Sequence, residues 1–124
     1  MSKQKKLLYR IIQESDRHMT AEEIFTAARR EMPSLALGTV YRNLGKMIEE
    51  GLIGRVEMPA EAPARYDRQS KPHPHLVCEQ CGSVEDIFVQ DDFLAPLIRS
   101  LPGKYTGYDM NIYCICPACA EAEA

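Results

Sequence analysis

The sequence lacks the long apolar stretches that would place a chain in a membrane or direct it out of the cell. No run within its 124 residues approaches the roughly 20 apolar residues of a transmembrane helix. The basic N-terminus is not followed by an apolar core and a small-residue cleavage site, so a secretory signal is not expected. We therefore expect a cytoplasmic protein with no membrane partner. The length suits one domain or two very small ones.

Histidine is also scarce, with only three residues, whereas cysteine is not, with five. Cysteines in a chain without a secretion signal favour metal ligation over disulfide bonds. Apart from two similar cysteine pairs, the sequence contains no internal repeat and no low-complexity tract. The residues that carry chemistry are therefore few, and their spacing can be read directly.

Four of the cysteines form two Cys-x-x-Cys pairs, namely Cys78 with Cys81 and Cys116 with Cys119. Two such pairs supply four thiolates, the tetrahedral ligand set of a structural Zn²⁺. Gly82 follows the first pair, where a small residue lets the backbone wrap around the sulfurs. A redox dithiol is the alternative, but no βαβ pattern adjoins either pair. The fifth cysteine, Cys114, is expected to pack as a small apolar residue, or else to compete for metal or oxidise.

A second group of possible ligands contains nitrogen and oxygen donors: His18, Asp67, His73, His75 and Asp86. Imidazole and carboxylate ligands suit Fe²⁺, Mn²⁺ or Zn²⁺ rather than a metal that seeks thiolates. Each residue also has a simpler interpretation. His18 could be an exposed loop residue, Asp67 could pair with Arg65 or Arg68, and Asp86 could lie on the surface of a strand. The pattern alone leaves these interpretations open.

Charge is distributed unevenly along the chain. Residues 1–56 contain ten basic and seven acidic residues, a net charge of +3, whereas residues 57–124 contain five and eleven, a net charge of −6. Only the first part is therefore expected to meet an anion. Its first helix is predicted over residues 5–14, where apolar residues recur at helical spacing and lysines occupy the other side.

Two further helices are predicted before residue 51. Thr20 and Glu23 form a capping box, which predicts a helix that starts there and ends around Glu31. Ser34 is expected to cap the next helix, which should run to about Glu50. Two short helices with a tight turn, the second with a polar and basic outer side, fit a helix-turn-helix. An ordinary helical hairpin is the alternative.

Strands are predicted over residues 52–57 and 64–67, separated by a segment rich in turn formers. A hairpin directly after a helix-turn-helix is the wing of a winged helix, from which Arg55 and Arg65 could contact DNA phosphate. Further strands are expected at 76–77 and 84–89, a short helix from Asp91 or Asp92 to Ser100, and a hairpin or strand at 105–115. The last strand would bring the second cysteine pair to the first. Because this part has little core, zinc would contribute folding free energy.

Jointly, these pieces resemble the ferric uptake regulator family of metal-dependent bacterial repressors. The matching segments are Thr-Ala-Glu-Glu-Ile (20–24), Gly-Thr-Val-Tyr-Arg-Asn-Leu (38–44), Glu-Gly-Leu-Ile (50–53), Arg-Tyr-Asp (65–67), His-Pro-His-Leu-Val-Cys-Glu-Gln-Cys-Gly (73–82) and Cys-Pro-Ala-Cys (116–119). The resemblance implies an α+β fold with an N-terminal winged helix-turn-helix domain (1–67), a hinge (68–72) and a small α/β dimerisation domain (73–124). The four cysteines correspond to the family's structural zinc, and the protein is expected to be a homodimer.

The nitrogen and oxygen donors match the regulatory Fe²⁺ or Mn²⁺ site of the family's peroxide-stress repressor branch, residue by residue. Iron-sensing members usually carry glutamates at the positions of Asp67 and Asp86, so the resemblance favours peroxide sensing. In that branch Fe²⁺ reacts with peroxide and a ligand histidine is oxidised, which makes His18 and His73 the expected targets. Mn²⁺ would support repression without reacting. An iron, manganese or zinc uptake regulator without an oxidative step is the alternative.

The resemblance also implies operator DNA as the partner. Thr39, Tyr41 and Arg42 are expected to contact base edges, although the spacing of Tyr41 also suits the core, and Lys46, Arg55 and Lys3 are expected to contact phosphates. Two departures from the family are expected to matter. A further helix that normally precedes the first is missing, and the region 106–115 is short and lacks a histidine, so two metals are expected rather than three.

Two other classes of protein are alternatives to a regulator. Two histidines and a carboxylate can activate oxygen in a non-haem iron enzyme, but no substrate pocket is suggested and the ligands lie on both sides of a hinge. A zinc-ribbon interaction module would leave His18 and Asp67 unexplained. We therefore expect a regulator, not an enzyme, with no small organic substrate.

Overall fold

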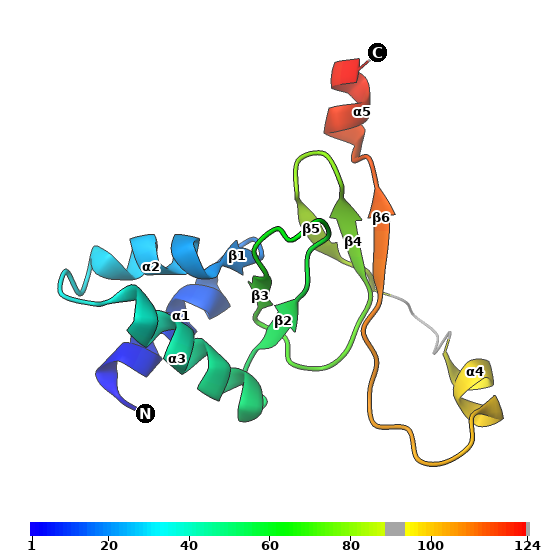
Figure 1. The fold of residues 1–124 in the computed structure, drawn as a ribbon, viewed down its shortest axis with the longest axis horizontal. Helices are drawn as coiled ribbons and strands as arrows, with labels where there is room; N and C mark the ends of the chain where they lie inside the picture. Colours follow the sequence, from blue (N-terminus) through cyan, green and yellow to red (C-terminus); the bar gives the residue numbers. More distant parts are fainter. Residues whose placement is uncertain (89–93, 124) are drawn as a thin grey trace. The chain divides into compact units, whose positions relative to one another are not determined.

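The computed structural model describes residues 1–88 and 94–123, and the chain divides into two compact units, Met1–Lys71 and Pro72–Ala124 (Figure 1). Each unit has its own sheet. Among the described residues, no helix has the length and apolar character needed to cross a bilayer.

The first unit contains three helices, α1 (Lys3–Glu14), α2 (Ala21–Arg29) and α3 (Leu37–Glu49). The predicted capping box is confirmed: the Thr20 hydroxyl accepts from the Glu23 N–H at 3.2 Å, and the Glu23 carboxylate accepts from the Thr20 N–H at 3.1 Å. This reciprocal pair satisfies two donors that a helix start would otherwise leave without partners. The start of α2 is thus encoded within four residues.

The predicted cap of α3 is wrong. Ser34 lies in a turn, and Ala36 is the N-cap without a side-chain hydrogen bond. The reason is the intervening Leu35, which is buried in the core at 5% exposure and whose N–H donates to the Met32 carbonyl. Burying this leucine requires a turn before the helix, so packing outweighs the local capping preference.

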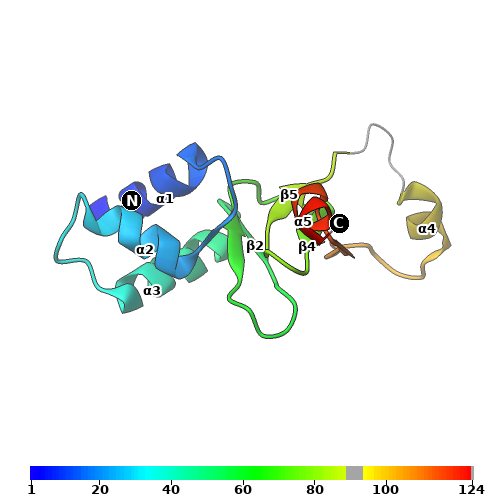
Figure 2. The ribbon, with the colours of Figure 1, turned by 90° about the horizontal axis from the view of Figure 1, so that it is seen from above.

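A small sheet completes the first unit, with strands β1 (Met19–Thr20), β2 (Gly54–Val56) and β3 (Arg65–Asp67) in the order β1-β3-β2, all antiparallel. The hairpin of β2 and β3 is the predicted wing, and its connecting loop is plain in Figure 2. Strand β1 was not predicted, because a two-residue strand carries no periodic signal. Its pairing with β3 places the residues around position 18 beside the wing.

The core of the first unit lies among its three helices. The largest fully buried side chains here come from all of them and from the approach to β2: Leu8, Ile24, Val40, Leu44, Met47 and Ile53. Their spacing on α3, at positions 40, 44 and 47, is that of one helix face. The opposite side of α3 is consequently free for other contacts.

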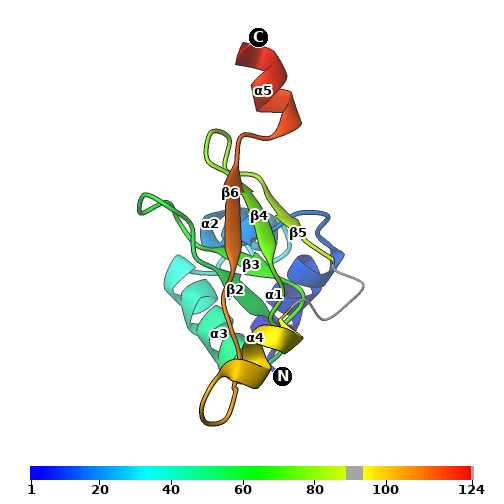
Figure 3. The same cartoon turned by 90° about the vertical axis from the view of Figure 1, so that its right-hand side faces the viewer.

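The second unit contains strands β4 (His75–Cys78), β5 (Val84–Asp86) and β6 (Asn111–Cys114) in the order β5-β4-β6. Strand β5 is antiparallel to β4, whereas β6 is parallel to it. Helix α4 (Ala95–Ser100) precedes β6, and α5 (Pro117–Glu123) continues beyond its end (Figure 3). The residues expected to cap the helix, Asp91 and Asp92, lie outside the described residues.

Few apolar side chains of the second unit are buried. Among its described residues, the buried hydrophobic ones are Val77 and Cys78. Large exposed hydrophobic residues are spread over the rest of this unit: Phe88, Leu97, Leu101, Tyr105, Ile112, Tyr113 and Ile115. Because so little apolar surface is removed from water within one chain, this unit needs stabilisation from another source.

Gly54 allows a test of how tightly the chain that follows β3 packs against β2. A Cβ at this position would lie 2.5 Å from the backbone oxygen of Gln69, so Gly54→Ala must displace the chain that follows Asp67. We expect a loss of roughly 1–3 kcal/mol in unfolding free energy, measured by urea unfolding followed through the helical circular dichroism signal.

Gly45→Ala is the matched control. Gly45 lies inside α3, and a Cβ there would meet nothing within 4 Å. Since alanine is the better helix former, this variant should gain roughly 0.5–1 kcal/mol. Equal unfolding midpoints for the two variants would contradict the packing described for Gly54.

Candidate metal centres

The four cysteines of the two pairs converge in the second unit. Cys78 ends β4, Cys81 lies in the following turn, Cys116 follows β6 and Cys119 lies in the first turn of α5. The Sγ atoms of Cys78 and Cys119 are 3.9 Å apart, and those of Cys81 and Cys116 are 3.8 Å apart. All four lie within 4.8 Å of one another. Four sulfurs at about 2.3 Å from a tetrahedral zinc are about 3.8 Å apart, so this set suits a structural Zn²⁺.

Backbone amides favour the thiolate form of Cys78, which is the form that binds a metal. The N–H groups of Cys81 and Cys116 point at this sulfur at 3.5 and 3.3 Å, and they lower the pKa of the Cys78 thiol to about 6. The hydroxyl of Ser83, 3.3 Å from its sulfur, lowers the pKa of Cys81. The hydrogen bond between the thiols of Cys119 and Cys116 raises the pKa of Cys119 to about 12. Zinc binding must therefore displace protons from this cluster.

Two backbone features bring the cysteines together. Strand β6 runs parallel to β4 with Cys114 paired to Cys78, and the Glu79 N–H donates to the Cys114 carbonyl at 2.9 Å. Gly82 adopts a positive φ of 76° while its N–H closes the turn onto the Cys78 carbonyl. This is the conformation for which glycine is preferred. Cys114 itself is half-buried beside the cluster, and burial raises the pKa of its thiol.

Replacing one cysteine at a time should distinguish the four zinc ligands from Cys114, which is not expected to bind the metal. Cys116→Ser is expected to lower the zinc content of the purified chain from one atom to nearly none and to expose the amides of β6 to hydrogen exchange, because this unit has little apolar core. Cys114→Ser should keep its zinc, and the amides of its β6 should stay protected from hydrogen exchange. Elemental analysis and exchange mass spectrometry measure both, and a zinc-free Cys114→Ser chain would contradict the assignment of the fifth cysteine.

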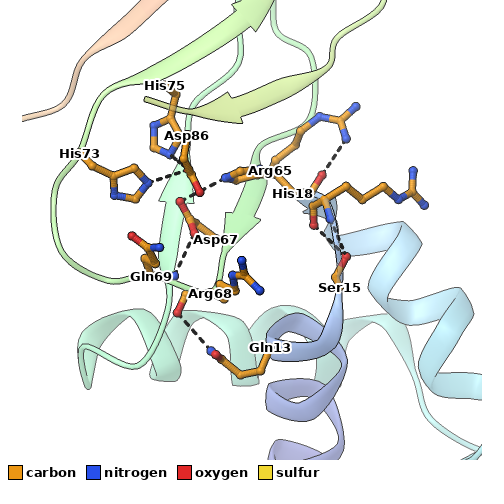
Figure 4. Close-up of polar contacts among 11 residues, drawn as sticks. Gln13, Ser15, His18, Arg65, Asp67, Arg68, Gln69, His73, His75 and Asp86 are labelled. Atoms are coloured by element: carbon orange, nitrogen blue, oxygen red, sulfur yellow. Dashed lines mark hydrogen bonds and ion pairs between the residues drawn. The ribbon is translucent and has the colours of Figure 1, made fainter. Parts of the chain in front are cut away.

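The first unit brings one histidine and one aspartate together from distant positions. His18 immediately precedes β1 and Asp67 ends β3, and the pairing of these strands puts the His18 Nε2 3.2 Å from the Asp67 Oδ2 (Figure 4). The other oxygen of Asp67 accepts from the Gln69 N–H at 2.9 Å, which orients the carboxylate. His18 is thus not an exposed loop residue, and Asp67 contacts a histidine.

The second unit gathers two histidines around one carboxylate. The Nε2 atoms of His73 and His75 lie 2.7 and 3.3 Å from the Oδ1 of Asp86, and the two rings are 4.4 Å apart at a tilt of 55°. His75 and Asp86 are direct partners in the β4–β5 pairing. Figure 4 shows both rings turned towards the carboxylate. Asp86 is therefore part of a cluster rather than an isolated surface residue.

Both groups offer the donors that Fe²⁺ and Mn²⁺ accept. Their nitrogen–oxygen distances of 2.7–3.3 Å match the spacing of about 3 Å between neighbouring ligands that each lie about 2.1 Å from an ion. No sulfur contributes, so thiolate-seeking metals have no advantage here. The chain therefore separates its ligands by chemistry, with sulfur for zinc and nitrogen and oxygen for iron or manganese.

The residues predicted to contact DNA lie in the first unit. Tyr41, Arg42 and Lys46 are exposed on α3, with Tyr41 at 49%, and Thr39 is partly buried. Arg55 is exposed on β2, where it pairs with Glu57 at 2.8 Å, and Lys3 is exposed at the start of α1. Tyr41 is thus not a core residue. Contact of these six side chains with DNA stays a prediction.

Arg65 lies elsewhere than the sequence suggested. Instead of extending from the wing, its guanidinium donates to the His18 carbonyl at 2.9 Å and reaches the Glu23 carboxylate at 3.5 Å. Partial burial raises the pKa of Glu23, but the Thr20 N–H, Arg17 and Arg65 outweigh it, and the pKa is lowered. The alternation of side chains along a strand was the available signal, since it places residues 65 and 67 on one side of β3.

Fold and donors together define a winged-helix protein with a small α/β unit, a four-cysteine zinc centre and a second set of imidazole and carboxylate donors. The model of the ferric uptake regulator family matches residues 1–104. The chain belongs to this family, whose members are transcription regulators that depend on metal. The family resemblance seen in the sequence is thereby confirmed.

Several relatives share most of the chain. The peroxide operon regulator of Bacillus subtilis (strain 168) is 31% identical over 108 residues, 86% of this chain and 74% of that protein. The peroxide-responsive repressor PerR of Staphylococcus epidermidis is 28% identical over 120 residues, 95% of this chain and 79% of that protein. The crystal structure of the Campylobacter jejuni peroxide stress regulator superposes with a TM-score of 0.81 at 26% identity, covering 94% of this chain and 88% of that one.

The fold is shared more widely than the sequence. The Helicobacter pylori ferric uptake regulator Fur superposes with a TM-score of 0.86 at 24% identity, covering all of this chain and 84% of that one. At this identity the likeness concerns the fold alone. It confirms the predicted α+β architecture.

Proposed function

We propose that this chain is a homodimeric repressor whose binding to operator DNA requires a regulatory ion held by His18, Asp67, His73, His75 and Asp86. The observation that carries the proposal is the division of the donors between the two units. His18 and Asp67 meet in the first unit, while His73, His75 and Asp86 meet in the second. Neither group alone offers more than three donor residues, whereas the two groups together offer five, so one ion gains ligands by drawing on both.

The position of the unit boundary gives such an ion a mechanical consequence. Asp67 belongs to the last strand of the first unit, and His73 is the second residue of the other unit. An ion bound from both sides of this boundary restrains the two units at one angle. Without it, only a fraction of molecules has that angle, and apparent DNA affinity falls by that fraction. Metal and DNA are then reciprocal effectors.

The angle matters because operator DNA is recognised by a dimer. Helix α3 presents Tyr41, Arg42 and Lys46 on its outer side. In a dimer, two copies of this helix must match half-sites about one helical turn apart. The exposed hydrophobic residues of the second unit, among them Ile112 and Tyr113 on β6, supply the apolar surface that a homodimer interface buries.

Peroxide is the signal that the ligand types favour. The chain has aspartates at positions 67 and 86, as expected of the peroxide-stress branch, and the relatives described above are named for peroxide response. A bound Fe²⁺ supplies the one-electron chemistry that makes peroxide an oxidant for an adjacent imidazole. His18 or His73 gains one oxygen atom and the peroxide leaves one molecule of water. The altered ring is a poorer nitrogen donor, which releases the restraint between the units.

The proposal is tested with the zinc-loaded full chain and a duplex that its Mn²⁺-loaded form selects from a random DNA pool. After a brief dose of peroxide, the Fe²⁺ form should lose at least tenfold in DNA affinity and gain one oxygen on the His18 or His73 peptide. The Mn²⁺ form should do neither.

Two outcomes would contradict parts of this proposal. If Mn²⁺ and Fe²⁺ forms both keep their affinity and their unmodified histidines, the chain is an uptake regulator without an oxidative step. If added metal enriches no duplex beyond the metal-free protein, the chain is not a metal-dependent repressor.

Exchange of one carboxylate separates metal binding from peroxide sensing. Asp86→Glu keeps the charge and the donor type, so Mn²⁺-dependent DNA binding should survive within about threefold. The longer side chain alters the approach to His73 and His75, and the rate of histidine oxidation at a given peroxide concentration should change.

The neighbouring exchange Glu85→Asp serves as the control, since this side chain is exposed on the other side of β5. Mass spectrometry of the histidine peptides gives both rates. An oxidation rate in Asp86→Glu equal to that of Glu85→Asp would count against the assigned role of this aspartate.

A further inference from the structure

Two side chains on the same side of strand β3 contact His18, one at its imidazole ring and one at its backbone carbonyl. The Asp67 carboxylate lies 3.2 Å from the imidazole, and the Arg65 guanidinium donates to the carbonyl of the same residue at 2.9 Å. Residues two apart on a strand share a side of it, while Tyr66 between them is buried in the core of the unit. One residue of the pair therefore holds the ring and the other holds the main chain.

The Arg65 guanidinium is itself held in place. Its Nη1 also lies 3.5 Å from Glu23 Oε1, the oxygen that accepts from the Thr20 N–H in the capping box of α2. The other oxygen of Glu23 pairs with Arg17 at 2.6 Å. His18 is thus connected through Arg65 to the first turn of α2, and its carbonyl takes one of the few orientations that this network allows.

This arrangement is not the one that stability alone would favour. The Nε of Arg65 is buried and has no hydrogen-bond partner among the residues that the structure describes. An unsatisfied buried donor is unfavourable, and such a group in a native fold calls for an explanation. Orientation of His18 provides one, because the Nη1 of the same guanidinium contacts both the His18 carbonyl and the Glu23 carboxylate.

We infer that Arg65 is a positioning residue for the regulatory metal, acting through His18. The inference rests on the proposed function, in which His18 is a ligand. Partners that orient a ligand typically change metal affinity by about 10- to 100-fold when they are removed. Arg65 acts on the backbone of the ligand, where Asp67 acts on its ring.

The experiment measures Mn²⁺ affinity of the zinc-loaded full chain by electron paramagnetic resonance of the free ion. Arg65→Gln should weaken Mn²⁺ binding roughly tenfold or more. Arg65→Lys should recover part of the loss, because an ammonium can donate to the His18 carbonyl but lacks the rigid planar shape that fixes the direction of a guanidinium's donors. Zinc content and circular dichroism establish that each variant is folded.

Arg17→Gln is the matched control. It removes the other arginine from the same Glu23 carboxylate, and its side chain is 61% exposed. Because the Arg17 guanidinium does not hold the His18 carbonyl, Mn²⁺ affinity should stay within about twofold of the unmodified chain. A loss in Arg17→Gln equal to that in Arg65→Gln would assign the effect to the charge around Glu23 and overturn the inference.

A double-mutant cycle distinguishes positioning from general damage. In a His18→Ala chain, Arg65→Gln should change Mn²⁺ affinity by less than about twofold, since the residue through which it acts is gone. A further tenfold loss would show that Arg65 serves the fold rather than His18.

If His18→Ala itself leaves Mn²⁺ affinity unchanged, the proposed ligand set is wrong and the inference falls with it. If His18→Ala weakens binding but Arg65→Gln does not, only the inference fails.

A metal-free measurement completes the test. In the chain that holds zinc alone, the ring signals of His18 in nitrogen-correlated nuclear magnetic resonance should be single and sharp. Arg65→Gln should broaden or split them, while those of His75 stay unchanged. Identical His18 signals in both chains would contradict a role for Arg65 in orienting this residue.

Discussion

The second unit depends on the convergence of four sulfurs at the corners of one tetrahedron. Val77 and Cys78 are the buried hydrophobic residues among those described in this unit, so apolar burial contributes little. The contact between Cys78 and Cys119 closes a segment of 41 residues. Because the four sulfurs converge only in the folded chain, the free energy of zinc binding adds to the free energy of folding and stabilises what the core cannot. The parallel pairing of β6 with β4 and the cysteine cluster at its end therefore support each other.

The first unit is stabilised in a different way. Its three helices bury Leu8, Ile24 and Leu44 completely, as in an ordinary small domain. The polar contacts around His18 are consequently not needed for the core. They lie at the sheet, whose central strand β3 contributes Arg65 and Asp67 to the same histidine. The four thiolates thus stabilise the second unit, whereas the nitrogen and oxygen donors come from both units.

This separation of roles has a chemical basis. Thiolates bind zinc tightly and close its coordination, whereas imidazole and carboxylate accept iron or manganese and exchange them more readily. A chain with both sets can keep one metal permanently while a second reports on its surroundings. The aspartates 67 and 86 and the histidines around them are suited to that second task, because each lies within hydrogen-bond distance of a partner of opposite type.

Short-range signals in the sequence determined several features. The capping box of Thr20 and Glu23 and the three helices of the first unit follow from residues a few positions apart, where side-chain chemistry and spacing act locally. The hairpin of the wing and each Cys-x-x-Cys pair are likewise signalled by short stretches of sequence. Tertiary structure alone decided the rest. The pairing of β1 with β3, the parallel placement of β6, the start of α3 after the buried Leu35 and the turn of Arg65 towards His18 each join or bury residues whose partners lie far along the chain. Such contacts leave no periodic trace, because their free energy arises only once the segments have met.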